Sequence, residues 1–192
     1  MTEINYVRVA YEALKIEHRM MFASLGGCFC LNPTPFEGKS EFGIDVSMTA
    51  DEVITSMGDL IGIQLEKGKS NIIYLDTFEK YFSKDQFQAI LAHEEGHAVH
   101  NDSEGAEYLT NREVRLGIEY RADEYAARKI GVSIMIEALE RTTQFMRELY
   151  EQTVVEQLSK YMDTSAITEL VIRDCAAISD DVSLQIKYLE SL

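Results

Sequence analysis

The sequence predicts an α+β fold that is mainly helical, with a small antiparallel sheet beside one central helix. Two capping boxes indicate helix starts, Thr49 with Glu52 and Ser83 with Gln86, each ahead of a stretch with helical periodicity. Short alternating or β-branched runs between the helical stretches are typical of strands. With 192 residues and 46% hydrophobic content, the chain is long enough to bury a full core.

The first third of the chain predicts two helices, a connector and a strand. Residues 3–25 carry hydrophobic residues at helical spacing and lead into a pair of glycines, which predicts an amphipathic helix. Residues 28–38 contain both prolines of the chain and predict an ordered or semi-extended connector. A strand is predicted where hydrophobic residues alternate, at Phe42, Ile44 and Val46. The capping box at Thr49 then starts the second helix.

A β-hairpin is predicted next. Its arms are Ile61–Leu65 and Asn71–Asp76, which flank the turn-like segment Glu-Lys-Gly-Lys-Ser. The second arm runs just ahead of the following helix. An exposed sheet edge at that place could hold an extended peptide by main-chain hydrogen bonds.

Three long helical patterns follow. The first covers residues 84–99, and the second covers residues 112–130 and ends at Gly131, a residue type suited to a helix C-terminus. The polar segment 101–110 between them is predicted to be a loop. The third pattern covers residues 133–162, and two shorter helices are expected after it.

The run His93-Glu94-Glu95-Gly96-His97 matches H-E-x-x-H within the first of these long helices. Residues four apart lie on one face of a helix, about 6 Å apart along its axis, so both imidazoles can reach one metal ion. Glu94 would project from the same side, where it can take a proton from water and pass it to a leaving amine. The pattern therefore predicts zinc-dependent peptide hydrolysis, provided that the chain supplies a third ligand.

The third ligand could come from His100 or from Glu119. If the helix continues, His93, His97 and His100 spread over about 10 Å of its axis, too far for one metal ion, so a solvated or capping role is expected for His100. Glu119 lies with Asp123 on an otherwise small and apolar face of the next predicted helix. Because an unpaired buried charge is costly, both carboxylates need partners. A metal ion is one such partner, and buried salt bridges to arginine or lysine are the alternative.

The H-E-E-G-H run, followed by Glu119-Tyr-Arg-Ala-Asp123, resembles the gluzincin zinc metallopeptidases. The nearest pattern is that of the CAAX-prenyl-endopeptidase type, with H-E-x-G-H and a later E-x-x-A-D. This resemblance implies one zinc ion held by His93, His97 and Glu119, with Glu94 as the catalytic base. It also implies that Asp123 steadies the first histidine, a role that fits because a zinc-bound histidine normally donates its other N–H to a carboxylate or a carbonyl.

The resemblance covers about residues 70–140 and implies a zincin-like catalytic core at residues 39–132. An N-terminal helix with its connector (residues 1–38) and a helical part packed on the core (residues 133–192) would complete one compact domain. The chain is also similar to the ImmA-type metallopeptidases of mobile genetic elements, which are soluble and carry H-E-x-G-H with a later glutamate-alanine helix. Asp123 favours the first family, whereas small size and solubility favour the second.

The composition of the chain excludes some classes of binding partner and favours one cellular compartment. The net charge of −15 argues against binding to nucleic acid or to an anionic membrane surface. No apolar run is long enough to span a membrane, no signal peptide is visible, and an odd count of three cysteines suits a reducing compartment. We therefore expect a cytoplasmic protein without membrane contact.

The smaller signals leave several questions open. Cys28 and Cys30 are expected to be ordinary buried thiols; a structural metal site or a thiolate masking the zinc are the weaker alternatives, and Cys175 is distant in sequence. A tyrosine could donate to the oxyanion of the tetrahedral intermediate, with three equal candidates. These are Tyr74, Tyr108 and Tyr120.

The sequence thus predicts a zinc-dependent endopeptidase that acts on a protein or peptide substrate and is selective for a cytoplasmic protein. The alternative is a non-catalytic zinc sensor or interaction module on the same scaffold. A homodimer formed through the C-terminal helices is a further possibility that the sequence leaves open.

Overall fold

The computed structural model describes residues 3–15, 18–19, 21–22, 26–39, 45–102, 111–158, 176 and 179–192. The described part is mainly helical with a small mixed sheet, so the predicted α+β class is confirmed. The strands are β1 (Ile4–Val9), β2 (Cys28–Leu31), β3 (Phe36–Lys39), β4 (Asp45–Met48) and β5 (Ser70–Leu75). The helices are η1 (Tyr11–Ala13), α2 (Ala50–Ile61), α3 (Phe78–Tyr81), α4 (Lys84–His100), α6 (Arg112–Ile130), α7 (Val132–Leu158) and a C-terminal helix over residues 179–190.

The main sheet has the strand order β1-β5-β2, and it is mixed rather than antiparallel as predicted. β1 runs parallel to β5 with Ile4 opposite Ser70, and β2 runs antiparallel to β5 with Cys28 opposite Tyr74. β5 is therefore the central strand. It has no free edge, and among the described strands of this sheet a peptide could add at β1 or at β2.

The predicted hairpin is wrong in its first arm, because Ile61 is the last residue of α2. Gly62 adopts a left-handed conformation at φ 72° and ends that helix. The buried Asn71 side chain then shapes the following loop, donating to the carbonyls of Glu66 and Lys69 and accepting from the Glu66 N–H. The segment before β5 is a loop held by one asparagine instead of a paired strand.

The predicted helix over residues 3–25 is wrong in its first part, since Ile4–Val9 forms strand β1. The β-branched residues of this segment suit a strand, and pairing with β5 satisfies their backbone groups. Residues 18–19 and 21–22 are helical, and residues 16–17, 20 and 23–25 lie outside the described residues. Residues 28–38, predicted to be an ordered or semi-extended connector, contain β2 and most of β3, and both prolines lie in the link at residues 32–35 between these strands. The strand predicted around Val46 is present as β4, while Phe42 and Ile44 lie outside the described residues.

The predictions of the helices that begin near residues 49, 84, 112 and 133 are confirmed. Of the two shorter helices predicted after them, one is described, at residues 179–190. Both capping boxes form, at Thr49 with Glu52 and at Ser83 with Gln86, and they open α2 and α4. α6 has the predicted bounds, and α7 begins one residue earlier than predicted. Residues 159–162 of the third predicted helix and most of the loop at 101–110 lie outside the described residues.

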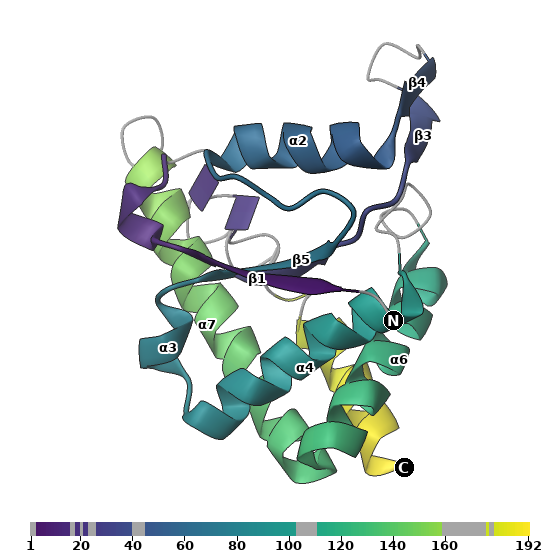
Figure 1. The fold of residues 1–192 in the computed structure, drawn as a ribbon. Coiled ribbons are helices and arrows are strands. Elements are labelled where there is room, and N and C mark those ends of the chain that lie inside the picture. The colour runs from purple at the N-terminus through teal and green to yellow at the C-terminus, as the bar shows by residue number, and fades with distance from the viewer. Residues whose placement is uncertain are drawn as a thin grey trace.

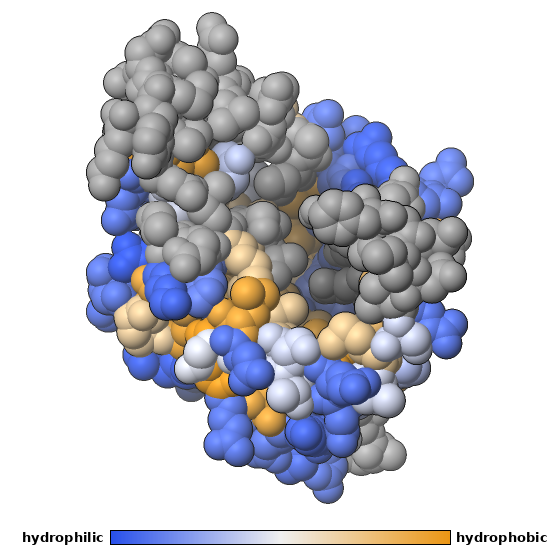
Figure 2. Space-filling view, turned by 90° about the horizontal axis from the view of Figure 1, so that it is seen from above, coloured by the Kyte–Doolittle hydropathy of each residue, from blue (hydrophilic) through white to orange (hydrophobic). Residues whose placement is uncertain are grey.

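In Figure 1 the sheet lies between α2 on one side and α4 and α6 on the other. α7 packs against α4 and α6 and runs past the sheet toward the side of α2. α4 contacts β2, β5, α6 and α7, so it is the helix on which the layers meet. Viewed from above, hydrophobic residues gather toward the middle of the described surface, and hydrophilic ones surround them (Figure 2). Within the described residues, no helix is long and apolar enough to cross a membrane.

The three predicted parts of the chain share one core. β1 and β2 belong to the first part and flank β5 of the second, while α7 of the third packs against α4. An aromatic cluster around the fully buried Phe78 joins α3 to α7, with ring centroids 4.8 Å from Phe82 and 4.7 Å from Phe145.

Candidate metal centre

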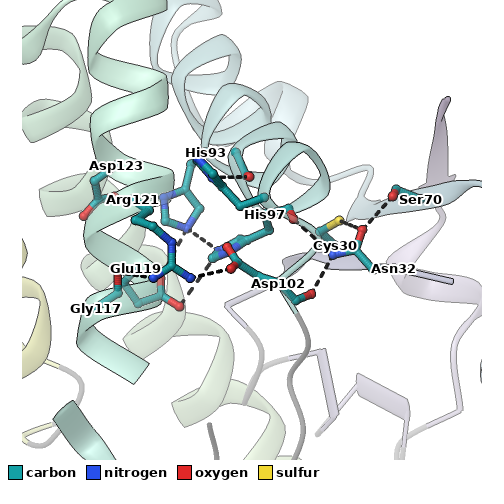
Figure 3. Close-up of polar contacts among 12 residues, drawn as sticks. Cys30, Asn32, Ser70, His93, His97, Asp102, Gly117, Glu119, Arg121 and Asp123 are labelled. Atoms are coloured by element: carbon teal, nitrogen blue, oxygen red, sulfur yellow. Dashed lines mark hydrogen bonds and ion pairs between the residues drawn. The ribbon is translucent and has the colours of Figure 1, made fainter. Parts of the chain in front are cut away.

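α4 brings His93 and His97 together, as the spacing of one helical turn requires. Their Nε2 atoms are 3.1 Å apart and their ring planes are almost perpendicular, at 86°. Both side chains are nearly buried, with 12% and 11% exposure. The two imidazoles therefore converge on one point at the side of the helix that faces α6 (Figure 3).

α6 supplies Glu119 to the same point. Its Oε2 lies 3.3 Å from Nε2 of His93, and its Oε1 lies 3.9 Å from Nε2 of His97. One ligand atom from each of the three residues lies within 4.8 Å of the other two. The three residues that the sequence proposed as ligands are thus assembled in the fold, from two helices.

Asp123 holds the outer nitrogen of His93. Its Oδ1 is 2.8 Å from Nδ1 of His93, and its side chain is fully buried. A ring nitrogen that faces a carboxylate carries the proton, which leaves Nε2 of His93 as the lone-pair donor toward the centre. Among the described residues, the other oxygen, Oδ2 of Asp123, has no hydrogen-bond partner. The alternative of salt bridges to arginine or lysine is not needed to explain why Asp123 is buried.

His97 has a matching partner that the sequence analysis missed, Asp102. Oδ2 of Asp102 lies 3.3 Å from Nδ1 of His97, and its Oδ1 accepts from Nη2 of Arg121 at 2.6 Å. Asp102 falls in the segment predicted as a polar loop, directly after Asn101, whose left-handed conformation at φ 53° ends α4. The available signal was its place just after a helix end, where the chain can fold back toward the last turn.

Asn32, directly after β2, links the C-terminal end of α4 to the sheet. Its Nδ2 donates to the carbonyls of His97 and Asp102, at 3.1 and 2.6 Å, and its Oδ1 accepts from the hydroxyl of Ser70 at 2.6 Å. Asn32 and Ser70 are both buried. The end of α4, with His97 on it, is therefore fixed to β2 and β5 (Figure 3).

The donor set fits a divalent transition metal. Two imidazole nitrogens and a carboxylate are ligands that zinc accepts, with a fourth position left for water or substrate as in catalytic sites. Because both Nδ1 atoms face carboxylates, the two Nε2 lone pairs and Glu119 point at one another, and this arrangement requires a cation or a proton among them. Burial alone would lower the pKa of His93, but the hydrogen bonds and charges of Asp123 and Glu119 outweigh it and raise that pKa well above 6.5.

Glu94 is buried beside the two histidines, with 7% exposure. Burial raises the pKa of its carboxyl, although the nearby His93 and His97 and a hydrogen bond from the backbone N–H of Cys30 oppose this rise. A carboxyl whose pKa is moved toward neutrality is better matched to taking up and releasing a proton. Its neighbour Glu95 contacts Tyr6 and Lys129 instead, so the two adjacent glutamates of the motif have different surroundings.

The other residues weighed from the sequence stay outside this cluster. Nδ1 of His100 lies 2.8 Å from the carbonyl of Gly96, so within the described residues it is no part of the ligand group. Cys28 and Cys30 are buried and free of disulfides, and neither joins the ligand group of the described residues, so no thiol masks it there.

None of the three tyrosines considered as oxyanion donors is assigned that role. Tyr74 packs edge-on against Phe87, and Tyr120 stacks on Tyr188. Tyr108 lies outside the described residues, as does Cys175.

Comparison with known proteins gives no relatives: no protein-family model, no curated protein and no solved structure matches the chain.

Proposed function

We propose that the chain is a zinc-dependent endopeptidase of zincin-like fold that hydrolyses a peptide bond with Glu94 as the general base. The observation that carries the proposal is the convergence of His93, His97 and Glu119 beside a buried glutamate. A purely structural zinc site closes its fourth position with a protein ligand and has no use for a base next to it. The pairing of His93 with Asp123 supports the likeness to the gluzincins of the CAAX-prenyl-endopeptidase type.

A zinc ion at this place would polarise the scissile carbonyl and acidify a water molecule. Glu94 accepts the proton from the attacking water and passes it to the leaving amine, so that the C–N bond breaks and a carboxylate and an amine are released. Asp123 and Asp102 hold the two imidazoles in the orientation that directs Nε2 inward. The network of Asn32 keeps His97 at a fixed distance from the sheet.

Strand β2 offers the place for an extended substrate. It is an edge strand of the described sheet and contacts α4. The N–H of Leu75 donates to the carbonyl of Gly27, so Gly27 and Phe29 face β5, while the backbone groups of Cys28 and Cys30 face the other edge, where the N–H of Cys30 already donates to Glu94. A peptide that lies along this outer edge would pass beside the metal-binding helix.

We further propose a selective action on one cytoplasmic protein, as the acidic composition and small size favour. Broad digestion of unfolded casein would count against selectivity.

The first experiment is elemental analysis of the purified wild-type protein, Glu94→Gln and Glu119→Ala. We expect about one zinc per chain in wild type and in Glu94→Gln and much less in Glu119→Ala. Hydrolysis is then measured by mass spectrometry on a proteome-derived peptide library. Glu95→Gln is the matched control, since it makes the same chemical change one residue away, where the carboxylate contacts Tyr6 and Lys129.

Cleavage by wild type and Glu95→Gln but not by Glu94→Gln supports the proposal. Zinc without any cleavage would favour the alternative function, a zinc-binding sensor or interaction module. Equal cleavage by Glu94→Gln would exclude the proposed role of this glutamate.

A further inference from the structure

The C-terminal helix packs along α6, the helix that carries the third ligand. Asp181 accepts hydrogen bonds from Arg112 and Arg115, at 2.7 and 2.9 Å. The ring of Tyr188 stacks on Tyr120 with centroids 4.5 Å apart and planes tilted by 13°. These contacts lie at both ends of one face of the C-terminal helix, because residues three and four apart share a face.

Gln185 lies on this face between Asp181 and Tyr188, and it is directed at the metal centre. Its Nε2 is 3.3 Å from Oε2 of Glu119, and the residue is 5% exposed. A buried amide is costly unless it is hydrogen-bonded, so a glutamine at this position needs the carboxylate as its acceptor. No sequence motif marks Gln185 or the C-terminal helix that carries it.

We propose that Gln185 is a positioning residue for Glu119, and that the C-terminal helix is thereby part of the metal centre. The inference rests on the proposed metal site. Each of the three ligands then has its own outer partner: Asp123 for His93, Asp102 for His97 and Gln185 for Glu119. The first two partners act on nitrogen ligands and accept a hydrogen bond, whereas Gln185 donates one to an oxygen ligand.

The physical effect is to limit the orientations of a flexible ligand. A glutamate side chain rotates about three bonds, and a donor on one oxygen restricts the plane of its carboxylate. Oε2 of Glu119 faces both Gln185 and His93, while Oε1 faces His97. Partners of this kind change metal affinity by roughly 10- to 100-fold when they are removed. Because coupling is reciprocal, zinc should also hold the C-terminal helix more tightly on α6.

The test compares the zinc affinity of wild type, Gln185→Met and Tyr188→Phe by competition with a chromophoric chelator. Methionine keeps the length of the side chain but cannot donate. Tyr188→Phe keeps the ring that stacks on Tyr120 and removes only the hydrogen bond from Tyr188 to Glu124 of α6. It therefore controls for the docking of the C-terminal helix on α6. We expect Gln185→Met to bind zinc about tenfold more weakly and Tyr188→Phe to bind like wild type.

Substitution of cobalt for zinc adds a spectroscopic measurement. The visible bands of bound Co²⁺ should shift in Gln185→Met, because the geometry of the Glu119 ligand changes, and should match wild type in Tyr188→Phe. If Gln185→Met does not fold, Gln185→Asn takes its place, since a side chain shorter by one carbon cannot reach Glu119 and the same loss is expected.

Equal affinity and identical spectra for Gln185→Met and wild type would overturn the inference and leave the metal site intact. Equal losses in Gln185→Met and Tyr188→Phe would overturn it too, because the effect would then come from helix docking. A wild-type protein that binds no zinc would instead remove the proposed function together with this inference.

Discussion

A Cβ placed on Gly96 of α4 would lie 2.8 Å from the Cα of Ala122 of α6, closer than such atoms come in proteins. The glycine inside the H-E-E-G-H run thus allows the two helices to touch at the backbone. Glu119 lies almost one turn before Ala122, so this contact sets the distance between Glu119 and the two histidines. The glycine of the motif has a packing reason in this fold, independent of chemistry.

Gly96→Ala should destabilise the protein by about 1–3 kcal/mol, the usual cost of an overpacked contact, and should weaken zinc binding by moving α6 away. Urea unfolding and zinc titration measure the two effects. Gly117→Ala is the matched control, because a Cβ there meets nothing within 4 Å. It should be neutral or stabilise the helix by up to about 1 kcal/mol. Equal effects of the two substitutions would contradict the role of the contact with Ala122.

Removing the partner of His97 should lower zinc affinity in graded steps. Asp102→Ala leaves Nδ1 of His97 without an acceptor and should cost roughly 10- to 100-fold in affinity. Asp102→Asn keeps an acceptor oxygen and should lose less. Arg121→Ala removes the half-exposed guanidinium that pairs with the other oxygen of Asp102, together with its long hydrogen bond to the carbonyl of Gly117, and should change little. Zinc competition titrations rank the affinities of the three variants. A loss in Arg121→Ala as large as in Asp102→Ala would argue against the role of Asp102 as the partner of His97.

The metal-free protein should lose stability as the pH rises above about 6.5. Burial alone would lower the pKa values of His93 and His97, but their carboxylate neighbours raise both above 6.5. A raised folded-state pKa stabilises the fold below the unfolded-state pKa, and this contribution disappears as the pH passes the folded-state value. Hydrogen bonds from His97 and Arg121 outweigh burial and lower the pKa of Asp102. The contribution of Asp102 to stability therefore changes with pH only in the acid range.

Zinc has to displace the histidine protons, so its affinity should rise over the same pH window. Urea unfolding from roughly pH 6 to 9, with and without zinc, would show a falling curve for the metal-free protein and a growing gap between the two. A metal-free protein that becomes more stable across this window would contradict the raised pKa values of the two histidines.

Chelation of the metal should lower the thermal midpoint of unfolding. A ligand present at a thousand times its dissociation constant stabilises the native state by about 4 kcal/mol. Calorimetry with added zinc and with excess chelator measures the difference. Glu119→Ala should show a much smaller shift than wild type, and equal shifts would mean that the metal binds elsewhere.

Several features were predictable because they depend on neighbours in the sequence. The capping boxes at Thr49 and Ser83 fix helix starts through contacts three residues apart, and both form. The spacing of His93 and His97 makes the pair meet on any regular helix. Glu119 and Asp123 could be placed on an inward face because both are charged residues among alanines.

The predictions from the sequence were wrong where a strand pairs with a segment far along the chain. Residues 4–9 and 28–31 become strands only because β5, far along the chain, lies between them. The hydrophobic spacing of residues 3–25 suits a helix equally well, and the tertiary environment decides between the two. The mixed sheet in place of the predicted antiparallel one follows from the same strand, since β1 pairs with it in parallel.

The sequence by itself placed two histidines and one glutamate on one helix and two inward carboxylates on the next, each through its position within its own helix. Only the tertiary structure decided which side chains surround them. Asp102 reaches His97 because Asn101 turns the chain back at the end of α4. Asn32, which follows strand β2, donates to the carbonyl of His97. Gln185 reaches Glu119 because the last helix docks on α6. Contacts of this kind come from packing between distant segments, and no local periodicity encodes them.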